Sequence, residues 1–120
     1  MWTPISLEEL NEIILAHQVH MNGKELRLWE MIKIEPQKWS EEEYGVEGGG
    51  FWAVGIFGKS VLWYNDIEGG FNTSSYTSPG KIDEYTCSQD ELYFTIRGIL
   101  RIIENGEQTS MRGVPKPLSL

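Results

Sequence analysis

The stretch FWAVGIFGKSVLWYNDI, Phe51–Ile67, decides the fold. It holds two runs of aromatic and β-branched residues, 51–57 and 60–67, which are joined by Gly58 and Lys59. Glycine at the first position of a two-residue loop favours a type II′ turn, so we predict an antiparallel β-hairpin. Because apolar residues occupy both faces of each run, we expect this hairpin to lie in the middle of a sheet.

The short loop also predicts the register of the hairpin. It pairs Phe57 with Ser60, and continued alternation then pairs Val54 with Trp63. One face is expected to carry Trp52, Val54, Ile56, Val61 and Trp63, and the other Phe51, Ala53, Phe57, Leu62 and Tyr64. We favour packing inside the protein for Trp52 and Trp63, because they share one hairpin face.

Further strands are expected on both sides of the hairpin. Apolar residues of one parity in 25–35 predict a half-buried strand that ends at Pro36 or continues only as an edge. The polar run Phe71–Tyr76 predicts a strand nearer an edge, and Ile82–Tyr85 is a candidate for one more short strand. A long solvent-facing loop is expected between Ser40 and Gly50.

A helix is expected at each end of this region. Ser6 and Glu9 form a capping-box pattern, which predicts a helix over 7–20 that Asn22 and Gly23 terminate. The pattern recurs at Ser88 and Glu91 and predicts a second helix that ends at 105–106. The apolar stripe of that helix consists of Leu92, Ile96, Ile99, Leu100 and Ile103.

Together these elements predict an α+β fold in the order α-β-β-β-β-α, with an antiparallel sheet of about four or five strands. We expect one domain over 1–106 and a flexible C-terminal tail over 107–120. We expect both helices to lie on one face of the sheet. The aromatic residues of the other face must then be covered by a loop or by a partner, or remain partly exposed.

Composition narrows the function classes. The 120 residues carry a formal net charge of −8, which argues against nucleic acid as the partner. The single cysteine, Cys87, excludes an intramolecular disulfide and fits a cytoplasmic protein. No apolar run approaches the length of a membrane helix, and two histidines with one cysteine are too few for a usual zinc site. We expect neither a metal nor a cofactor.

The negative charge is concentrated in the middle of the chain. Between Ser40 and Ile96 there are ten acidic residues and two basic ones, Lys59 and Lys81, whereas acids and bases balance outside this segment. An acidic surface of this kind favours a basic protein partner, and the alternative is a face that only aids solubility. The candidate partner-binding residues are Trp39, Glu41, Glu42, Glu43, Tyr44, Glu47, Asp66, Glu68, Asp83 and Glu84.

Other chemistries remain open at this point. Asp66 and Glu68 follow aromatic residues, so they could serve a small enzyme or a ligand-binding domain as paired carboxylates, although such residues at strand ends usually form turns. Cys87 precedes a helix and could be nucleophilic with His17 or His20, the alternative being a structural thiol. A homodimer through the aromatic face of the sheet is a third hypothesis.

Three short motifs carry a resemblance. GGGFW at 48–52, WYNDIE at 63–68 and CSQDEL at 87–92 resemble a family of small, mostly uncharacterised bacterial proteins, which is similar in type to the immunity proteins that accompany secreted bacterial toxins. The resemblance implies a small cytoplasmic inhibitor without cofactors. Its partner would be a basic toxin.

Overall fold

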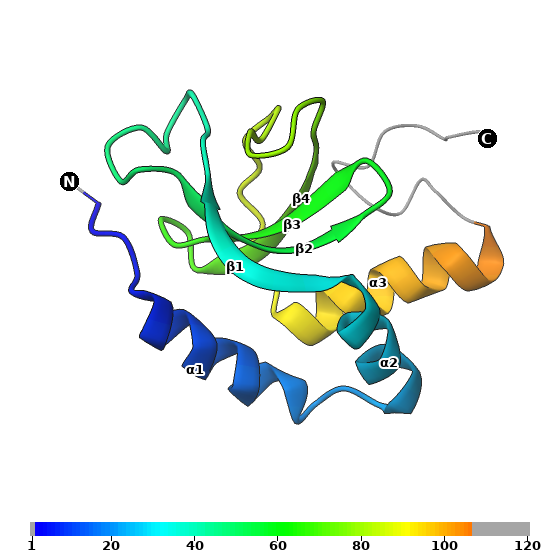
Figure 1. Ribbon diagram of the computed structural model, residues 1–120. Coiled ribbons are helices and arrows are strands. Elements are labelled where there is room, and N and C mark those ends of the chain that lie inside the picture. Colours follow the sequence, from blue (N-terminus) through cyan, green and yellow to red (C-terminus); the bar gives the residue numbers. More distant parts are fainter. Residues whose placement is uncertain (1, 107–120) are drawn as a thin grey trace.

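The computed structural model describes residues 2–106, and the predicted flexible tail at 107–120 lies outside this range. The helices are α1 (Leu7–Gln18), α2 (Gly23–Ile32) and α3 (Leu92–Asn105). The strands are β1 (Lys33–Trp39), β2 (Phe51–Phe57), β3 (Ser60–Asn65) and β4 (Gly70–Ser75). They pair antiparallel in the order β1-β2-β3-β4 (Figure 1). The α+β class and the central hairpin are confirmed, whereas the predicted element order lacks α2.

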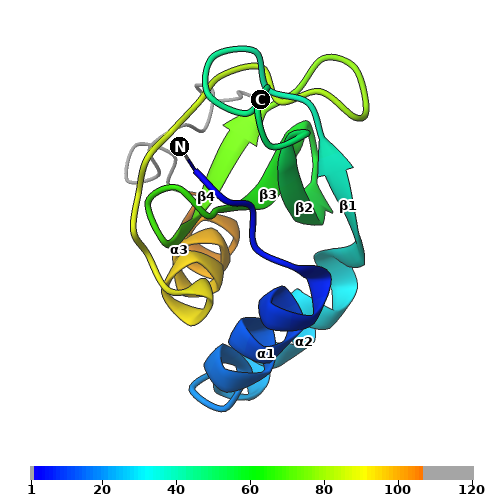
Figure 2. The same cartoon turned by 90° about the vertical axis from the view of Figure 1, so that its left-hand side faces the viewer.

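All three helices lie on one face of the sheet (Figures 1 and 2), where the sequence had predicted two. The core on this face contains residues of α1, α2, α3 and the three strands β2, β3 and β4. Its most deeply buried members include Leu10 of α1, Leu62 of β3 and Ile96 of α3. Helix packing against a sheet therefore provides the main core of the protein.

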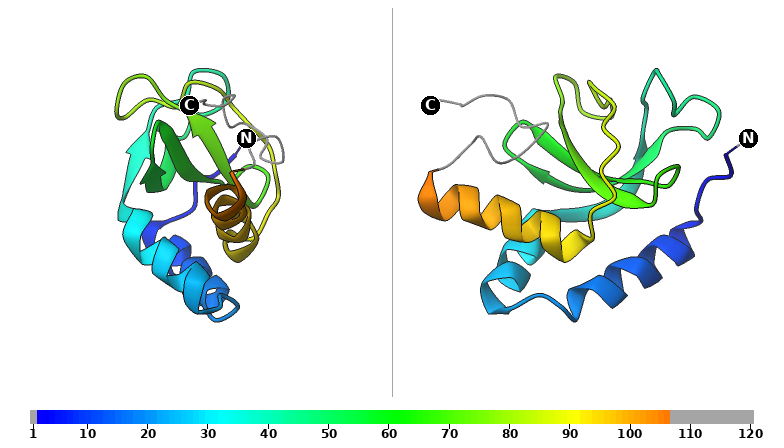
Figure 3. Two further views of the ribbon diagram at one scale, coloured as in Figure 1. Left: turned by 90° about the vertical axis from the view of Figure 1, so that its right-hand side faces the viewer. Right: turned by 180° about the vertical axis from the view of Figure 1, so that it is seen from behind.

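The opposite face of the sheet is covered by loops and by the N-terminal segment (Figure 3). A second buried cluster lies there, and it consists of Trp39, Phe51, Ala53, Val61, Trp63 and Ile82. The ring of Trp2 stacks on Phe51 with 5.2 Å between centroids. Loops thus account for the aromatic residues of this face, and a homodimer through it would require these segments to move.

The predicted strand over 25–35 is wrong in its first part, because residues 23–32 form α2. Asn22 begins this helix instead of ending α1. Its side chain accepts the N–H of Glu25 at 2.9 Å, and the Glu25 carboxylate accepts the N–H of Asn22 at 3.0 Å. Leu28 and Ile32 are buried on one side of the helix, as helical spacing requires. Strand β1 then runs through Pro36 as an edge strand, one of the two expected outcomes.

The register of the hairpin is correct only near the turn. Phe57 pairs with Ser60 as predicted, but Ala53, not Val54, pairs with Trp63. A β-bulge between Ala53 and Gly55 adds one residue to β2. Residues 51–54 of β2 therefore lie on the face opposite to their predicted partners. Val54 and the half-buried Trp52 pack with Leu62 under the helices, so Trp52 and Trp63 do not share a face as predicted.

The predicted capping box of the last helix is also wrong. Helix α3 begins one turn later than Ser88, and the side chain of its N-cap residue, Glu91, makes no capping hydrogen bond. Instead, the N–H of Leu92 donates to Nδ1 of His17 at 2.9 Å. The predicted end is confirmed, since Gly106 adopts a left-handed conformation, but Ile103 is exposed and lies outside the buried stripe.

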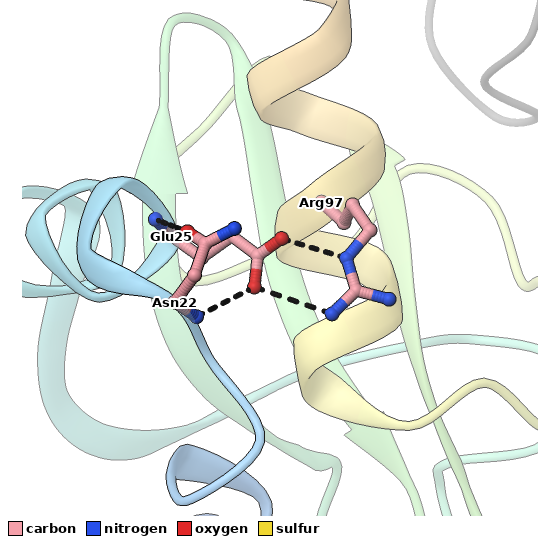
Figure 4. Close-up of polar contacts among 3 residues, drawn as sticks. All are labelled: Asn22, Glu25 and Arg97. Atoms are coloured by element: carbon pink, nitrogen blue, oxygen red, sulfur yellow. Dashed lines mark hydrogen bonds and ion pairs between the residues drawn. The ribbon is translucent and has the colours of Figure 1, made fainter.

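A half-buried ion pair connects α2 to α3 (Figure 4). Glu25 is only 2% exposed, and its carboxylate accepts hydrogen bonds from Nε and Nη2 of Arg97 at 2.6 and 3.3 Å. The hydrogen bond from Arg97 is the main reason why the pKa of Glu25 lies below its usual value. The same carboxylate caps α2, so one side chain both starts a helix and ties it to another.

Candidate functional site

Two loops that are distant in sequence form an acidic groove on the side of the sheet away from the helices. The groove is lined by residues 41–43 of one loop and 81–85 of the other. Ser40 donates its N–H to the carbonyl of Gly80 at 2.8 Å and accepts the N–H of Ile82 at 2.9 Å. These backbone hydrogen bonds replace the short strand that was predicted over 82–85. They hold the two loops side by side.

Glu41 shapes the first loop and does not face solvent. Its side chain is 4% exposed, and its carboxylate accepts the N–H groups of Glu43, Tyr44 and Gly45 at 3.0, 2.6 and 2.9 Å. Three backbone donors therefore surround this negative charge. Glu41 was predicted to contact a partner directly, but its carboxylate is buried. It instead fixes the loop and so positions its neighbours.

The exposed carboxylates of the acidic groove belong to Glu42, Glu43, Asp83 and Glu84. Among residues 2–106, Lys81 is the single basic residue that lines it, and its Nζ lies 3.0 Å from Oε2 of Glu42. This hydrogen bond raises the pKa of Lys81, so the lysine remains charged. The groove keeps an excess of negative charge, because one ammonium group faces four exposed carboxylates.

An aromatic pair lies next to the acidic groove. Tyr44 is 53% exposed, and its ring is 4.4 Å from the ring of Tyr85. Burial raises the pKa of Tyr85, which therefore stays neutral. Trp39, the other predicted interface aromatic, is 1% exposed and packs edge-on against Tyr76. Only Tyr44 of the two presents a ring to solvent.

The remaining acidic candidates lie in separate surroundings. Glu47 is exposed on the loop before β2 and does not line the groove. Asp66 is half-buried, and its Oδ2 accepts the N–H of Ile5 at 2.7 Å. Burial raises the pKa of Asp66. Its hydrogen bond to Ile5 secures the N-terminal segment. Glu68 is exposed and does not line the hollow that Asp66 lines. The structure therefore does not pair Asp66 with Glu68 as an acid and a base.

Cys87 and His17 lie in different surroundings. Cys87 is exposed, whereas Nδ1 of His17 is engaged by the backbone of Leu92. Within residues 2–106, no three His, Cys, Asp or Glu side chains gather as a metal site would require. None of the helices described has the length and apolar character needed to cross a bilayer.

Comparison of the chain with protein-family models, with curated proteins and with solved structures finds no match. A functional assignment therefore rests on the geometry of the acidic groove.

Sequence reasoning missed two polar residues that organise the molecule. One is Glu25, which was placed in a strand because Asn22 and Gly23 were interpreted as the end of the preceding helix, although Asn22 and Glu25 have capping-box spacing. The other is His17, whose contact with Leu92 joins residues 75 positions apart. A local pattern signals the first of these contacts, but none signals the second.

Proposed function

We propose that the protein is a non-enzymatic binding module whose acidic groove receives a basic protein partner, in the manner of an inhibitor that covers the cationic site of a bacterial toxin. The proposal rests on one observation. Two loops about forty residues apart bring four exposed carboxylates around a single, already paired lysine.

Electrostatics explains how such a surface would act. Complementary charge accelerates the encounter of two proteins and orients them before contact, and the effect weakens as salt screens it. The ring of Tyr44 beside the groove supplies an anchor of the kind that contributes strongly at the centre of interfaces. Neither a cofactor nor a catalytic residue enters this function, and the exposed thiol of Cys87 suits the reducing cytoplasm.

Charge reversal tests the proposal. The partner is first captured from an extract of the native host on the immobilised protein and eluted with salt. The triple variant Glu42→Lys, Glu43→Lys, Asp83→Lys is then compared with the wild type for the rate of association at low salt. Glu41 is left unchanged, because its carboxylate holds the loop.

We expect the association rate to fall at least tenfold and the dissociation rate to change much less, since exposed charges act mainly on the encounter. The triple variant Glu8→Lys, Glu12→Lys, Glu35→Lys is the matched control, because it changes the net charge equally at exposed residues of α1 and β1 that do not line the groove. An association rate that is unchanged in the groove variant, or equally reduced in the control, would refute the proposal.

A further inference from the structure

A narrow slot of about 240 Å³ lies between β4, the segment 86–90 and α3. Its volume exceeds that of a cavity that holds benzene and lies below the range of drug-sized pockets, so it suits a ligand of about ten non-hydrogen atoms. Among residues 2–106, no residue of this slot lines the acidic groove. The slot is therefore independent of the surface proposed for a protein partner.

A glycine in the middle of α3 leaves space for the slot. Phe94, Gly98 and Arg101 are three or four residues apart and all line it, a spacing that places them on one face of the helix. Because Gly98 has no side chain, a hollow remains between the ring of Phe94, which is 53% exposed, and the side chain of Arg101. Glycine destabilises a helix interior relative to alanine, and Gly98 does not have the positive φ that would require it. Its visible consequence is the hollow.

Groups of opposite charge lie at the two ends of the slot. Asp90 precedes the first turn of α3, whereas Arg101 lies in its third turn, and both line the slot. Neither forms an ion pair with another side chain of residues 2–106. The neighbouring Arg97 is already bound to Glu25. Within the described part of the chain, the slot thus offers one unpaired carboxylate and one unpaired guanidinium group.

The floor of the slot adds a hydroxyl group without a partner. Thr73 of β4 is 6% exposed and lies on the same side of the strand as Phe71, which packs in the core under the helices. Within residues 2–106 no group forms a hydrogen bond with this hydroxyl, and its oxygen is not among the fully enclosed unpaired atoms, so it faces the slot. The hydroxyl of Thr95, by contrast, donates to the carbonyl of Glu91. Since buried polar groups usually have partners, a ligand in the slot would provide the missing one.

The two charges are close enough for one small molecule to reach both. The backbone of α3 rises about 15 Å from Glu91 to Arg101. Helical side chains point back towards the N-terminus, so the guanidinium group of Arg101 lies over the turn of Gly98 and closer to Asp90 than its own backbone does. A zwitterion with a hydrogen bond of about 3 Å at each end can therefore bridge the two groups.

We propose that the slot binds a free amino acid with an apolar side chain. The ammonium group binds Asp90, the carboxylate binds Arg101, and the side chain packs on the ring of Phe94, which lies between them along α3. Arginine suits this role because its planar guanidinium group binds a carboxylate through two parallel hydrogen bonds. Thr73 forms a further hydrogen bond at the floor. A few polar groups that fix orientation, next to an apolar wall, are typical of small-molecule sites.

Titration with L-leucine and two analogues that each lack one charge tests this proposal. The analogues are isopentylamine, without the carboxylate, and isocaproate, without the ammonium group. Binding to the full chain is followed through the amide chemical shifts of the nitrogen-labelled protein. Gly98→Leu fills the slot, and it should fold because leucine favours helix more than glycine does. Arg101→Gln removes the partner of the carboxylate, and Arg27→Gln at an exposed position of α2 is the matched control.

We expect leucine to bind with a dissociation constant below about 5 mM and to shift the amide resonances of Phe94, Gly98 and Arg101. Removal of either charge from the ligand, Gly98→Leu and Arg101→Gln should each weaken binding at least tenfold, whereas Arg27→Gln should change it less than twofold. The proposal is overturned if leucine binds more weakly than this limit, or if an analogue, Gly98→Leu or Arg101→Gln leaves the affinity unchanged. Shifts confined to residues 41–45 and 81–85 would overturn it as well, because they would place the ligand in the acidic groove.

Discussion

The two faces of the sheet are buried to the same degree by different means. Under the helices, Val54 is 0% exposed and packs in a core that α1, α2 and α3 close. On the other face, Val61 is also 0% exposed, but its cover consists of loops and the N-terminal segment. Residues on the two faces are therefore equally buried, although helices cover one face and loops cover the other.

The difference lies in how the backbone of each cover is satisfied. Helices satisfy most of their own N–H and C=O groups, whereas loops depend on contacts with other segments and with side chains. On the loop face, polar side chains provide many of these contacts. Asn65 donates to the carbonyl of Thr86 and accepts the N–H groups of Ile67 and Glu68, and Glu41 accepts three N–H groups. The loops that these side chains hold also form the acidic groove. Binding residues are often found on loops that a rigid scaffold positions.

A matched pair of core truncations should separate the two faces most clearly. We expect Ile96→Ala, under the helices, to lower the free energy of unfolding by about 3–4 kcal/mol, because packed elements leave a cavity. Ile82→Ala, under the loops, should cost about 2 kcal/mol, since a loop can collapse onto the space. Urea denaturation measures both values. Equal losses would show that the loop cover is as rigid as the helices.

The ion pair between α2 and α3 should show the next largest effect. Glu25→Gln removes a charge that accepts two hydrogen bonds from Arg97, and we expect a loss of about 2 kcal/mol. The loss should be smaller than for a fully buried pair, because Arg97 is 41% exposed and water can solvate it. The pKa of Glu25 is lowered in the folded state, so this contribution is complete at neutral pH and is lost as the pH falls below about 4.5. A Glu25→Gln variant that loses stability with acid as steeply as the wild type would contradict this.

Lowering the pH should weaken the contact between α1 and α3 at a higher pH than it weakens the ion pair of Glu25 and Arg97. His17 accepts the N–H of Leu92 through Nδ1, so protonation would break this bond and place a cation at a helix N-terminus. Burial lowers the pKa of His17, so the unfolded chain binds the proton more tightly. Stability should therefore decrease as the pH falls from about 6.5 towards the folded pKa, by at most about 1.4 kcal/mol per pH unit. Thermal unfolding of His17→Gln should lack this slope, and His20→Gln should retain it.

The smallest effect is expected for an exposed ion pair between α2 and α3. Nζ of Lys24 lies 2.9 Å from Glu104, and the side chains are 65% and 43% exposed. Lys24→Gln should change the free energy of unfolding by less than about 0.5 kcal/mol, because water screens the pair. Its comparison with Glu25→Gln isolates the effect of burial. A loss as large as that of Glu25→Gln would mean that geometry, and not burial, decides the strength of these pairs.

Sequence periodicity failed at α2 for a definable reason. Leu28 and Ile32 are four residues apart, a spacing that suits both the period of a strand and that of a helix. The capping signal at Asn22 and Glu25 would have resolved the ambiguity, but it competed with the turn signal of Asn22 and Gly23. In a strand with Leu28 and Ile32 facing inward, Trp29 would face outward. Its burial therefore shows that the segment has helical periodicity.

The candidate site was recognised in part. The charge count identified the acidic segment, and Glu42, Glu43, Tyr44, Asp83 and Glu84 do lie in or beside one groove. Burial of Glu41 and Trp39 could not be read from the chain, because both depend on how a loop folds back over the sheet. The β-bulge at Val54 was also not predicted, because no residue type at this position indicates a bulge.

Local chemistry in the chain was enough to specify the hairpin turn at Gly58, the start of α1 at Ser6 and the end of α3 at Gly106, because each depends on neighbours within a few residues. Only the tertiary structure decided which carboxylates face solvent and which hold the backbone. That choice depends on contacts between distant segments, such as Ser40 with Gly80 and His17 with Leu92, whose partners become neighbours only when the sheet has formed.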